Sequence, residues 1–167
     1  MRNTPVAIDL FSGCGGFSTG LLDAGVRVAA GFDHEKRAIA VYNYNHAHRG
    51  SKGYAVDLRE LSGDQLLKLA GVSRADIVVG GPPCQAFSII GKQQGMDDSR
   101  GQLMDDFVRL VGEVAPRVFI LENVPNLAKV DGGRIYNDVI AKLKGLGYCV
   151  RAAVLSASDY GVAQMRK

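Results

Sequence analysis

The sequence has no long apolar run, no block of basic residues and no apolar leader after its first residues. Its apolar stretches, such as residues 76–79, are too short to cross a bilayer, and the N-terminus does not resemble a secretory signal. The basic residues are scattered and the net charge of +3 is compatible with a polyanionic partner without requiring one. The sequence therefore predicts a cytoplasmic protein with no membrane partner.

Cysteine is also scarce. Cys14, Cys84 and Cys149 are odd in number and far apart, and no CxxC pair is present. This pattern argues against a disulfide framework and against a zinc site, so we expect no metal. Internal repeats, linkers and low-complexity segments are missing too, and 167 residues fit one domain spanning residues 1–167.

Short β-branched runs alternate with longer stretches of helical periodicity, which is the pattern of a parallel α/β sheet. We expect strands at residues 6–11, 26–32, 54–56, 76–79, 117–121 and 151–156, and helices at 17–24, 35–45, 65–69, 103–114 and 135–146. The fold class that follows is a doubly wound, mostly parallel α/β sheet. Residues 82–101 lack periodicity and are expected to form a long loop, a feature that is usually functional.

Three strand ends predict an adenosine site. The glycine-rich stretch 12–16 follows the first strand, Asp33 ends the second strand twenty residues after Gly13, and Asp57 follows the third. Carboxylates at these positions accept hydrogen bonds from ribose hydroxyls and from an adenine amino group. The stretch is not GxGxxG, so a nicotinamide-dependent oxidoreductase loses its fingerprint. The alternative is that the glycines make a tight turn and both aspartates cap helices.

Two further strand ends carry reactive groups. Pro82 and Pro83 make a stiff platform directly before Cys84, a candidate nucleophile, although most cysteines are simply buried small residues. Glu122 follows a strand that reads as buried and is expected at the same sheet edge as Cys84, as a proton-donating group. Its alternative role is to cap a helix or pair with an arginine.

These motifs together resemble the DNA cytosine-5 methyltransferases. The stretch Asp9–Ser18 resembles the cofactor motif of the family, 81–88 its nucleophile motif and 122–124 its base-holding motif. Residues 98–103 and 159–166 are similar to the intervening loop and to the arginine motif. The matches run in the family's order and spacing from residue 6 to the end of the chain.

The resemblance implies a Rossmann-like methyltransferase fold that binds S-adenosyl-L-methionine and acts on double-stranded DNA. It implies that the cysteine thiolate adds to C6 of a flipped-out cytosine, whose C5 then takes the methyl group. The implied catalytic residues are Cys84, Glu122 and Arg166, and the implied DNA contacts are Gln85, Ser88 and Arg100. The implied cofactor contacts are Phe11, Gly13, Cys14, Gly16, Asp33, His34, Asp57, Leu58, Pro83 and Leu103. His34 departs from the family, which often carries a large aromatic residue there.

The chain ends within the arginine motif, so the resemblance implies an incomplete sheet that lacks the target-recognition region and the C-terminal helix. We expect either a fragment of a longer enzyme or one subunit of a split methyltransferase completed by a second polypeptide. Two other readings stay open. One is a tRNA cytosine-5 methyltransferase on the same scaffold, and the other is a non-catalytic binding module, which would have no reason to keep both Cys84 and Glu122.

Overall fold

Five short strands form one parallel sheet in the computed structural model, which describes residues 4–83 and 102–166. The strand order is β3-β2-β1-β4-β5. The strands are β1 (Val6–Leu10), β2 (Arg27–Asp33), β3 (Lys52–Ala55), β4 (Ile77–Gly80) and β5 (Val118–Leu121). The order reverses between β1 and β4, which makes the carboxyl ends of these two strands the topological switch point.

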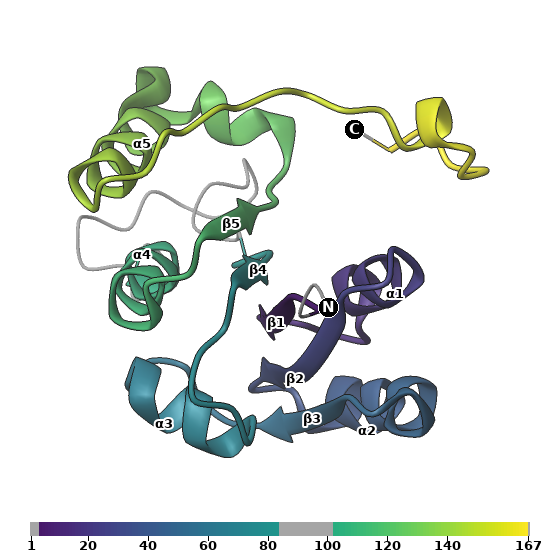
Figure 1. The fold of residues 1–167 in the computed structure, drawn as a ribbon. Helices are drawn as coiled ribbons and strands as arrows, with labels where there is room; N and C mark the ends of the chain where they lie inside the picture. Colours follow the sequence, from purple (N-terminus) through teal and green to yellow (C-terminus); the bar gives the residue numbers. More distant parts are fainter. Residues whose placement is uncertain (1–3, 84–101, 167) are drawn as a thin grey trace.

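In the part of the chain that the structure describes, α-helices cover the two faces of this sheet (Figure 1). They are α1 (Gly16–Asp23), α2 (Lys36–His46), α3 (Gly63–Leu69), α4 (Gln102–Val114) and α5 (Arg134–Gly145). Helices α1 and α2 lie on one face and α3, α4 and α5 on the other, so the doubly wound α/β architecture predicted from the sequence is confirmed. Among the described residues, no helix is both long enough and apolar enough to cross a membrane.

The helix ends follow from local sequence. The side chains of Ser62 and Gln65 form a capping box at the start of α3, and Glu35 caps α2 by accepting the N–H of Arg37. Gly25, predicted to end the first helix, has φ of 78° and directly follows Ala24, the C-cap of α1. These caps explain why the predicted helices agree with the structure to within two residues.

The main hydrophobic core lies between the sheet and the α3–α4–α5 layer. Phe107, Leu110 and Val111 of α4 are fully buried against residues of the central strands such as Leu10 and Val78. Removal of apolar side chains from water is in general the dominant favourable contribution to folding. The carboxyl ends of β1 and β4 lie side by side above this core, because the two strands pair in register from Ala7 and Ile77 to Leu10 and Gly80.

Two predictions about strands were wrong. Residues 151–156 form no strand: Figure 1 shows them as a yellow trace leaving α5, and Val154 and Leu155 are 66% and 58% exposed. A strand needs a hydrogen-bonding partner, and strand propensity alone does not supply one. The strand ending before Glu122 is also not buried, because β5 is an edge strand on which Val118 and Ile120 are 51% and 42% exposed.

Candidate functional site at the switch point of the sheet

The loop between β1 and α1 has a strained backbone. Phe11, Gly13 and Gly15 all have positive φ angles, of 54°, 52° and 94°. A bulky residue such as Phe11 rarely adopts this conformation, and such strain concentrates at functional sites. The loop is held by two hydrogen bonds to the end of β2: Ser12 N–H donates to the Phe32 carbonyl at 3.0 Å, and Gly13 N–H donates to Oδ2 of Asp33 at 2.9 Å.

The two faces of this loop differ in how closely they are packed. A Cβ atom added at Gly13 or Gly16 would meet no atom of residues 4–83 or 102–166 within 4 Å, so a ligand can approach the backbone there. A Cβ atom at Gly15 would overlap His46 of α2 and lie 2.9 Å from Cδ2 of Tyr42. Gly15 therefore seals the loop against the protein, whereas Gly13 and Gly16 face open space.

Asp9 lies directly below the loop, on β1, and is only 1% exposed. Its Oδ2 accepts the backbone N–H of Ser18 at 3.2 Å and the Ser18 hydroxyl at 2.7 Å. Burial is the main cause that raises the pKa of the Asp9 carboxyl from 3.8 to about 7, against the lowering effect of the Ser18 hydrogen bonds. Within the described residues, Oδ1 of Asp9 and Oγ of the nearby Ser12 are buried without a hydrogen-bond partner. Unsatisfied buried polar atoms are uncommon, and here they flank the glycine-rich loop.

Asp33 lies where the sequence predicts a ribose-binding carboxylate. Its Oδ2 accepts from Gly13 N–H and its Oδ1 accepts the N–H of Glu35 at 2.8 Å. Each carboxylate oxygen can accept a second hydrogen bond, so both oxygens keep capacity for a ligand. The ring of His34, 74% exposed, lies with Nδ1 3.3 Å from Asp33 Oδ1.

Asp57 follows β3 and is paired with Arg59, whose Nε lies 2.9 Å and 3.0 Å from the two carboxylate oxygens. The hydrogen bonds from Arg59 are the main cause that lowers the pKa of Asp57 to about 2. The next residue, Leu58, has its side chain in the core, and its carbonyl accepts from Nη2 of Arg109 on α4 at 2.9 Å. Arg109 therefore anchors the segment that carries Asp57.

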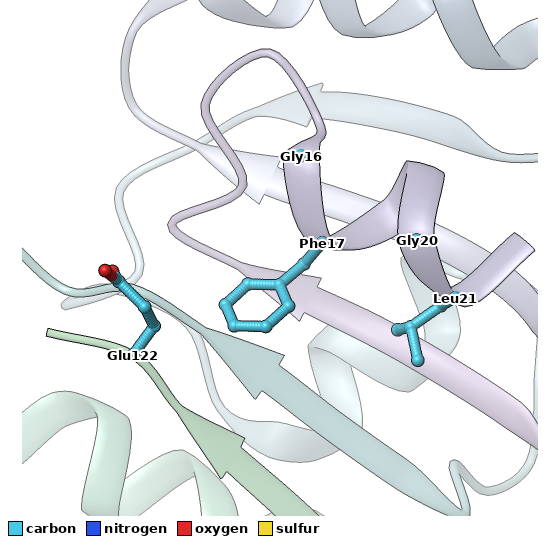
Figure 2. Close-up of a pocket in the computed structure, with 5 residues that line it drawn as sticks. All are labelled: Gly16, Phe17, Gly20, Leu21 and Glu122. Carbon is cyan, nitrogen blue, oxygen red and sulfur yellow. The ribbon is translucent and has the colours of Figure 1, made fainter. Parts of the chain in front are cut away.

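A pocket of about 440 Å³ opens between α1 and the end of β5. Figure 2 shows the Phe17 ring projecting from the start of α1 toward the side on which Glu122 lies. The pocket is lined by Gly16, Phe17, Gly20, Leu21 and Glu122. The predicted cofactor loop and the predicted acid thus border the same space, although the strands that carry them are not neighbours in the sheet.

Asn123 ties the end of β5 to the end of β4. Its Nδ2 donates to the Pro82 carbonyl at 3.0 Å, and its Oδ1 accepts the N–H of Val124 at 2.9 Å. The backbone N–H of Glu122 donates to the Gly80 carbonyl at 3.0 Å. The segment that leads to Pro83 is therefore fixed relative to Glu122 by both backbone and side-chain hydrogen bonds.

A model of the C-5 cytosine-specific DNA methylases matches residues 6–167. The chain belongs to this family. Its curated relatives include the Type II methyltransferase M.XorII of Xanthomonas oryzae pv. oryzae, 39% identical over 98% of this chain and 39% of the relative. Another is the Type II methyltransferase M.HhaI of Haemophilus parahaemolyticus, 38% identical over 96% of this chain and 46% of the relative. The chain thus spans less than half the length of these relatives.

Solved structures agree with this methylase assignment. One, described as a DNA modification methyltransferase encoded within an E. coli prophage, has a TM-score of 0.72 and 34% identity, over 85% of this chain and 38% of its own. The S. pombe Dnmt2 methyltransferase also has a TM-score of 0.72, over 98% of this chain and 47% of its own. At 20% identity, the likeness to Dnmt2 shows the fold alone.

The remaining predicted site residues differ in their exposure, and some lie outside the described residues. Pro83 and Leu103 are half-buried, Cys14 is exposed on the glycine-rich loop, and Arg166 is exposed. The backbone carbonyl of Arg166 accepts from Ala157 N–H at 2.8 Å. The predicted nucleophile and DNA contacts lie outside the described residues: they are Cys84, Gln85, Ser88 and Arg100. Among the residues that are described, no group of three or more His, Cys, Asp or Glu side chains could hold a metal ion.

The sequence did not reveal the roles of three side chains of this candidate site. Arg109 gave no signal, because an arginine on a helix is ordinary until its partners are known. Asp9 was noticed only as the first residue of the cofactor motif, and its burial has no signal in the sequence. Asn123 was noticed only as part of a motif, and its hydrogen bond to Pro82 depends on a residue 41 positions away. Each of the three acts by holding another part of the site in place.

Proposed function

We propose that this chain is the cofactor-binding and catalytic part of a DNA cytosine-5 methyltransferase that uses S-adenosyl-L-methionine. The observation that carries the proposal is the pocket beside the carboxyl ends of the strands, which α1 and Glu122 line together. Ligands of open α/β sheets bind at this position. Family membership and relatives that are named Type II methyltransferases support the same activity.

The residues present fit an adenosine-containing cofactor. Gly13 and Gly16 leave room for close approach of a ligand to the backbone. Asp33 would bind the ribose hydroxyls with the free capacity of its two oxygens, and Asp57 would accept from the adenine amino group. Phe11 and His34 would contact the adenine, with Cys14 beside them. The apolar walls would come from Leu58, Pro83 and Leu103.

The bound cofactor supplies an electrophilic methyl group on a sulfonium. The protein's task is to activate C5 of cytosine, which is a weak nucleophile. The Cys84 thiolate would add to C6 of the ring, while Glu122 contacts N3 and the exocyclic amine and stabilises the protonated ring. After C5 has taken the methyl group, a base removes the C5 proton and the thiolate leaves by elimination. Arg166 would stabilise the pyrimidine or its phosphate through its guanidinium group.

The proposal for Cys84 rests on its motif and on its place directly after Pro83, whose segment Asn123 anchors. The target base must leave the duplex to expose its face to a thiol. Gln85, Ser88 and Arg100 would contact the DNA around it. Further contacts to the DNA would come from a target-recognition region, in the same protein or on a second polypeptide. The enzyme would act on DNA in the cytoplasm.

The test is covalent trapping by an oligonucleotide that carries 5-fluorocytosine, using the complete protein encoded by the gene together with any partner polypeptide. Fluorine at C5 cannot leave as a proton does, so the Cys84–C6 bond persists. We expect an adduct that requires S-adenosyl-L-methionine, that disappears in Cys84→Ala and that survives in Cys149→Ala. An adduct located on Cys14 or Cys149 would overturn the assignment, and so would DNA methylation without any adduct. Methylation of tRNA in place of DNA would support the alternative substrate.

A further inference from the structure

Tyr42 of α2 is fully buried in a slot formed by three glycines from three separate segments. A Cβ atom at Gly53 of β3 would lie 2.9 Å from its Cδ1, one at Gly31 of β2 would lie 2.9 Å from its hydroxyl oxygen, and one at Gly15 would lie 2.9 Å from its Cδ2. Any larger residue at these positions would displace the ring. The slot places the Tyr42 ring directly against the end of the glycine-rich loop.

The Tyr42 hydroxyl lies in the middle of a buried chain of hydrogen bonds. Its oxygen is 2.7 Å from Ser51 Oγ and 2.8 Å from Ser18 Oγ, and Ser18 Oγ in turn is 2.7 Å from Asp9 Oδ2. Asp9 Oδ2 also accepts the Ser18 N–H, so it is the acceptor for the Ser18 hydroxyl and the single Ser18 proton goes to Asp9. Tyr42 must then donate to Ser18 and Ser51 must donate to Tyr42. Burial raises the pKa of Tyr42 above its ordinary value, which keeps the hydroxyl protonated as this polarity requires.

This chain of hydrogen bonds reaches both ends of the glycine-rich loop. Asp9 precedes it on β1 and Ser18 follows it in the first turn of α1. The residue before α1, Gly15, forms no side-chain cap, and the Ser18 N–H is bonded by Asp9 instead. Asp9 therefore takes the role of an N-cap from the other end of the loop. Loss of the Tyr42 hydroxyl would leave Ser18 buried with an unfilled acceptor, which weakens this link.

A second contact from the same helix supports the arrangement. His46, one turn after Tyr42, packs its ring 4.5 Å from the Tyr42 ring, measured between centroids. Its Nε2 lies 2.9 Å from the Thr19 hydroxyl, which is also 3.0 Å from the Gly15 carbonyl. Helix α2 thus holds the end of the loop at Gly15 and the first turn of α1 at two adjacent points.

We propose that Tyr42 is a positioning residue for the cofactor: its hydroxyl, acting through Ser18 and Asp9, holds the glycine-rich loop in the conformation that binds S-adenosyl-L-methionine. The inference rests on the proposed function, because it assumes that the loop binds this cofactor. Tyr42 itself lies behind the loop, on the side that Gly15 seals, so it acts through the protein and not by touching the ligand.

The test compares Tyr42→Phe with Ser51→Ala, which is a matched control. Each variant removes one hydroxyl from the same buried chain, but only Tyr42→Phe removes the bond to Ser18. Calorimetric titration with S-adenosyl-L-methionine should show affinity weakened about fivefold to tenfold in Tyr42→Phe and less than about twofold in Ser51→Ala. In the complete enzyme, Tyr42→Phe should raise the KM for the cofactor and leave kcat nearly unchanged.

A purely structural role for the hydroxyl predicts equal effects of the two variants, and that result would overturn the inference. Wild-type affinity in Tyr42→Phe would overturn it as well. If Tyr42→Phe fails to fold, Ser18→Ala tests the same bond from its other end, and its loss of affinity should again exceed that of Ser51→Ala. A wild-type protein that binds no cofactor would instead refute the proposed function, and this inference with it.

Discussion

Replacement of Asp9 by Asn is the most informative test of the site's electrostatics. The carboxyl is 1% exposed, and burial raises its pKa from 3.8 to about 7. Asn keeps a side-chain oxygen to accept the two hydrogen bonds from Ser18 but cannot ionise. The variant therefore removes the titration of this position while keeping its local contacts.

The sign of the effect follows from proton binding. Between pH 4 and pH 7 the folded chain holds a proton on Asp9 that the unfolded chain has released, so this group makes the folded state less stable as pH rises. The two pKa values, 3.8 and about 7, differ by about three, and each tenfold step corresponds to about 1.4 kcal/mol. Above neutral pH, ionisation of Asp9 thus lowers the free energy of unfolding by on the order of 4 kcal/mol relative to the chain with protonated Asp9. Between pH 5 and pH 8 alone, the wild-type chain should lose about 2 to 3 kcal/mol relative to Asp9→Asn.

Urea unfolding followed by circular dichroism at several pH values from 5 to 8 measures this difference. Groups that titrate equally in both proteins cancel when the variant is subtracted from the wild type. Asp64→Asn, which removes an exposed carboxylate from the first turn of α3, is a control that should not reproduce the pH effect. A gap between wild type and Asp9→Asn that stays constant from pH 5 to pH 8 would refute the raised pKa.

Three further outcomes are expected. Gly15→Ala should lower the free energy of unfolding by at least about 2 kcal/mol, because its Cβ would lie 2.9 Å from Tyr42 Cδ2. Gly13→Ala should lower it by about 1 kcal/mol, because Gly13 faces open space and only its positive φ is unfavourable for alanine. Thermal unfolding of the two variants measures this difference. Arg109→Ala should lower the free energy of unfolding in urea by about 1 to 3 kcal/mol, because it leaves two backbone carbonyls after β3 without their donor. An unchanged unfolding midpoint would contradict the anchoring role of Arg109. Asp33→Ala should weaken S-adenosyl-L-methionine binding by about 1.5 to 3 kcal/mol in calorimetry, and equal affinity would show that the carboxylate does not bind the ribose.

Much of the fold could be predicted because its signals are local. The helices that begin at Lys36 and Gly63 carry their caps within a few residues, and the strand at 77–80 is a continuous apolar run. Residues 151–156 show where such signals fail. Their β-branched and apolar residues favour a strand, but a strand exists only where an edge pairs with it. Among the described residues, no strand pairs with the outer side of β5.

The sequence by itself determined the order of the strand ends and the residue types that they carry: a glycine-rich turn, Asp33, Asp57 and Glu122. These follow from spacing along the chain, because parallel strands present their carboxyl ends at one edge. Only the tertiary structure decided that Asp9 would be buried with a raised pKa, and that Tyr42 would reach Ser18 through a gap left by glycines. Burial and side-chain hydrogen bonds depend on residues tens of positions apart, and their partners are set by packing.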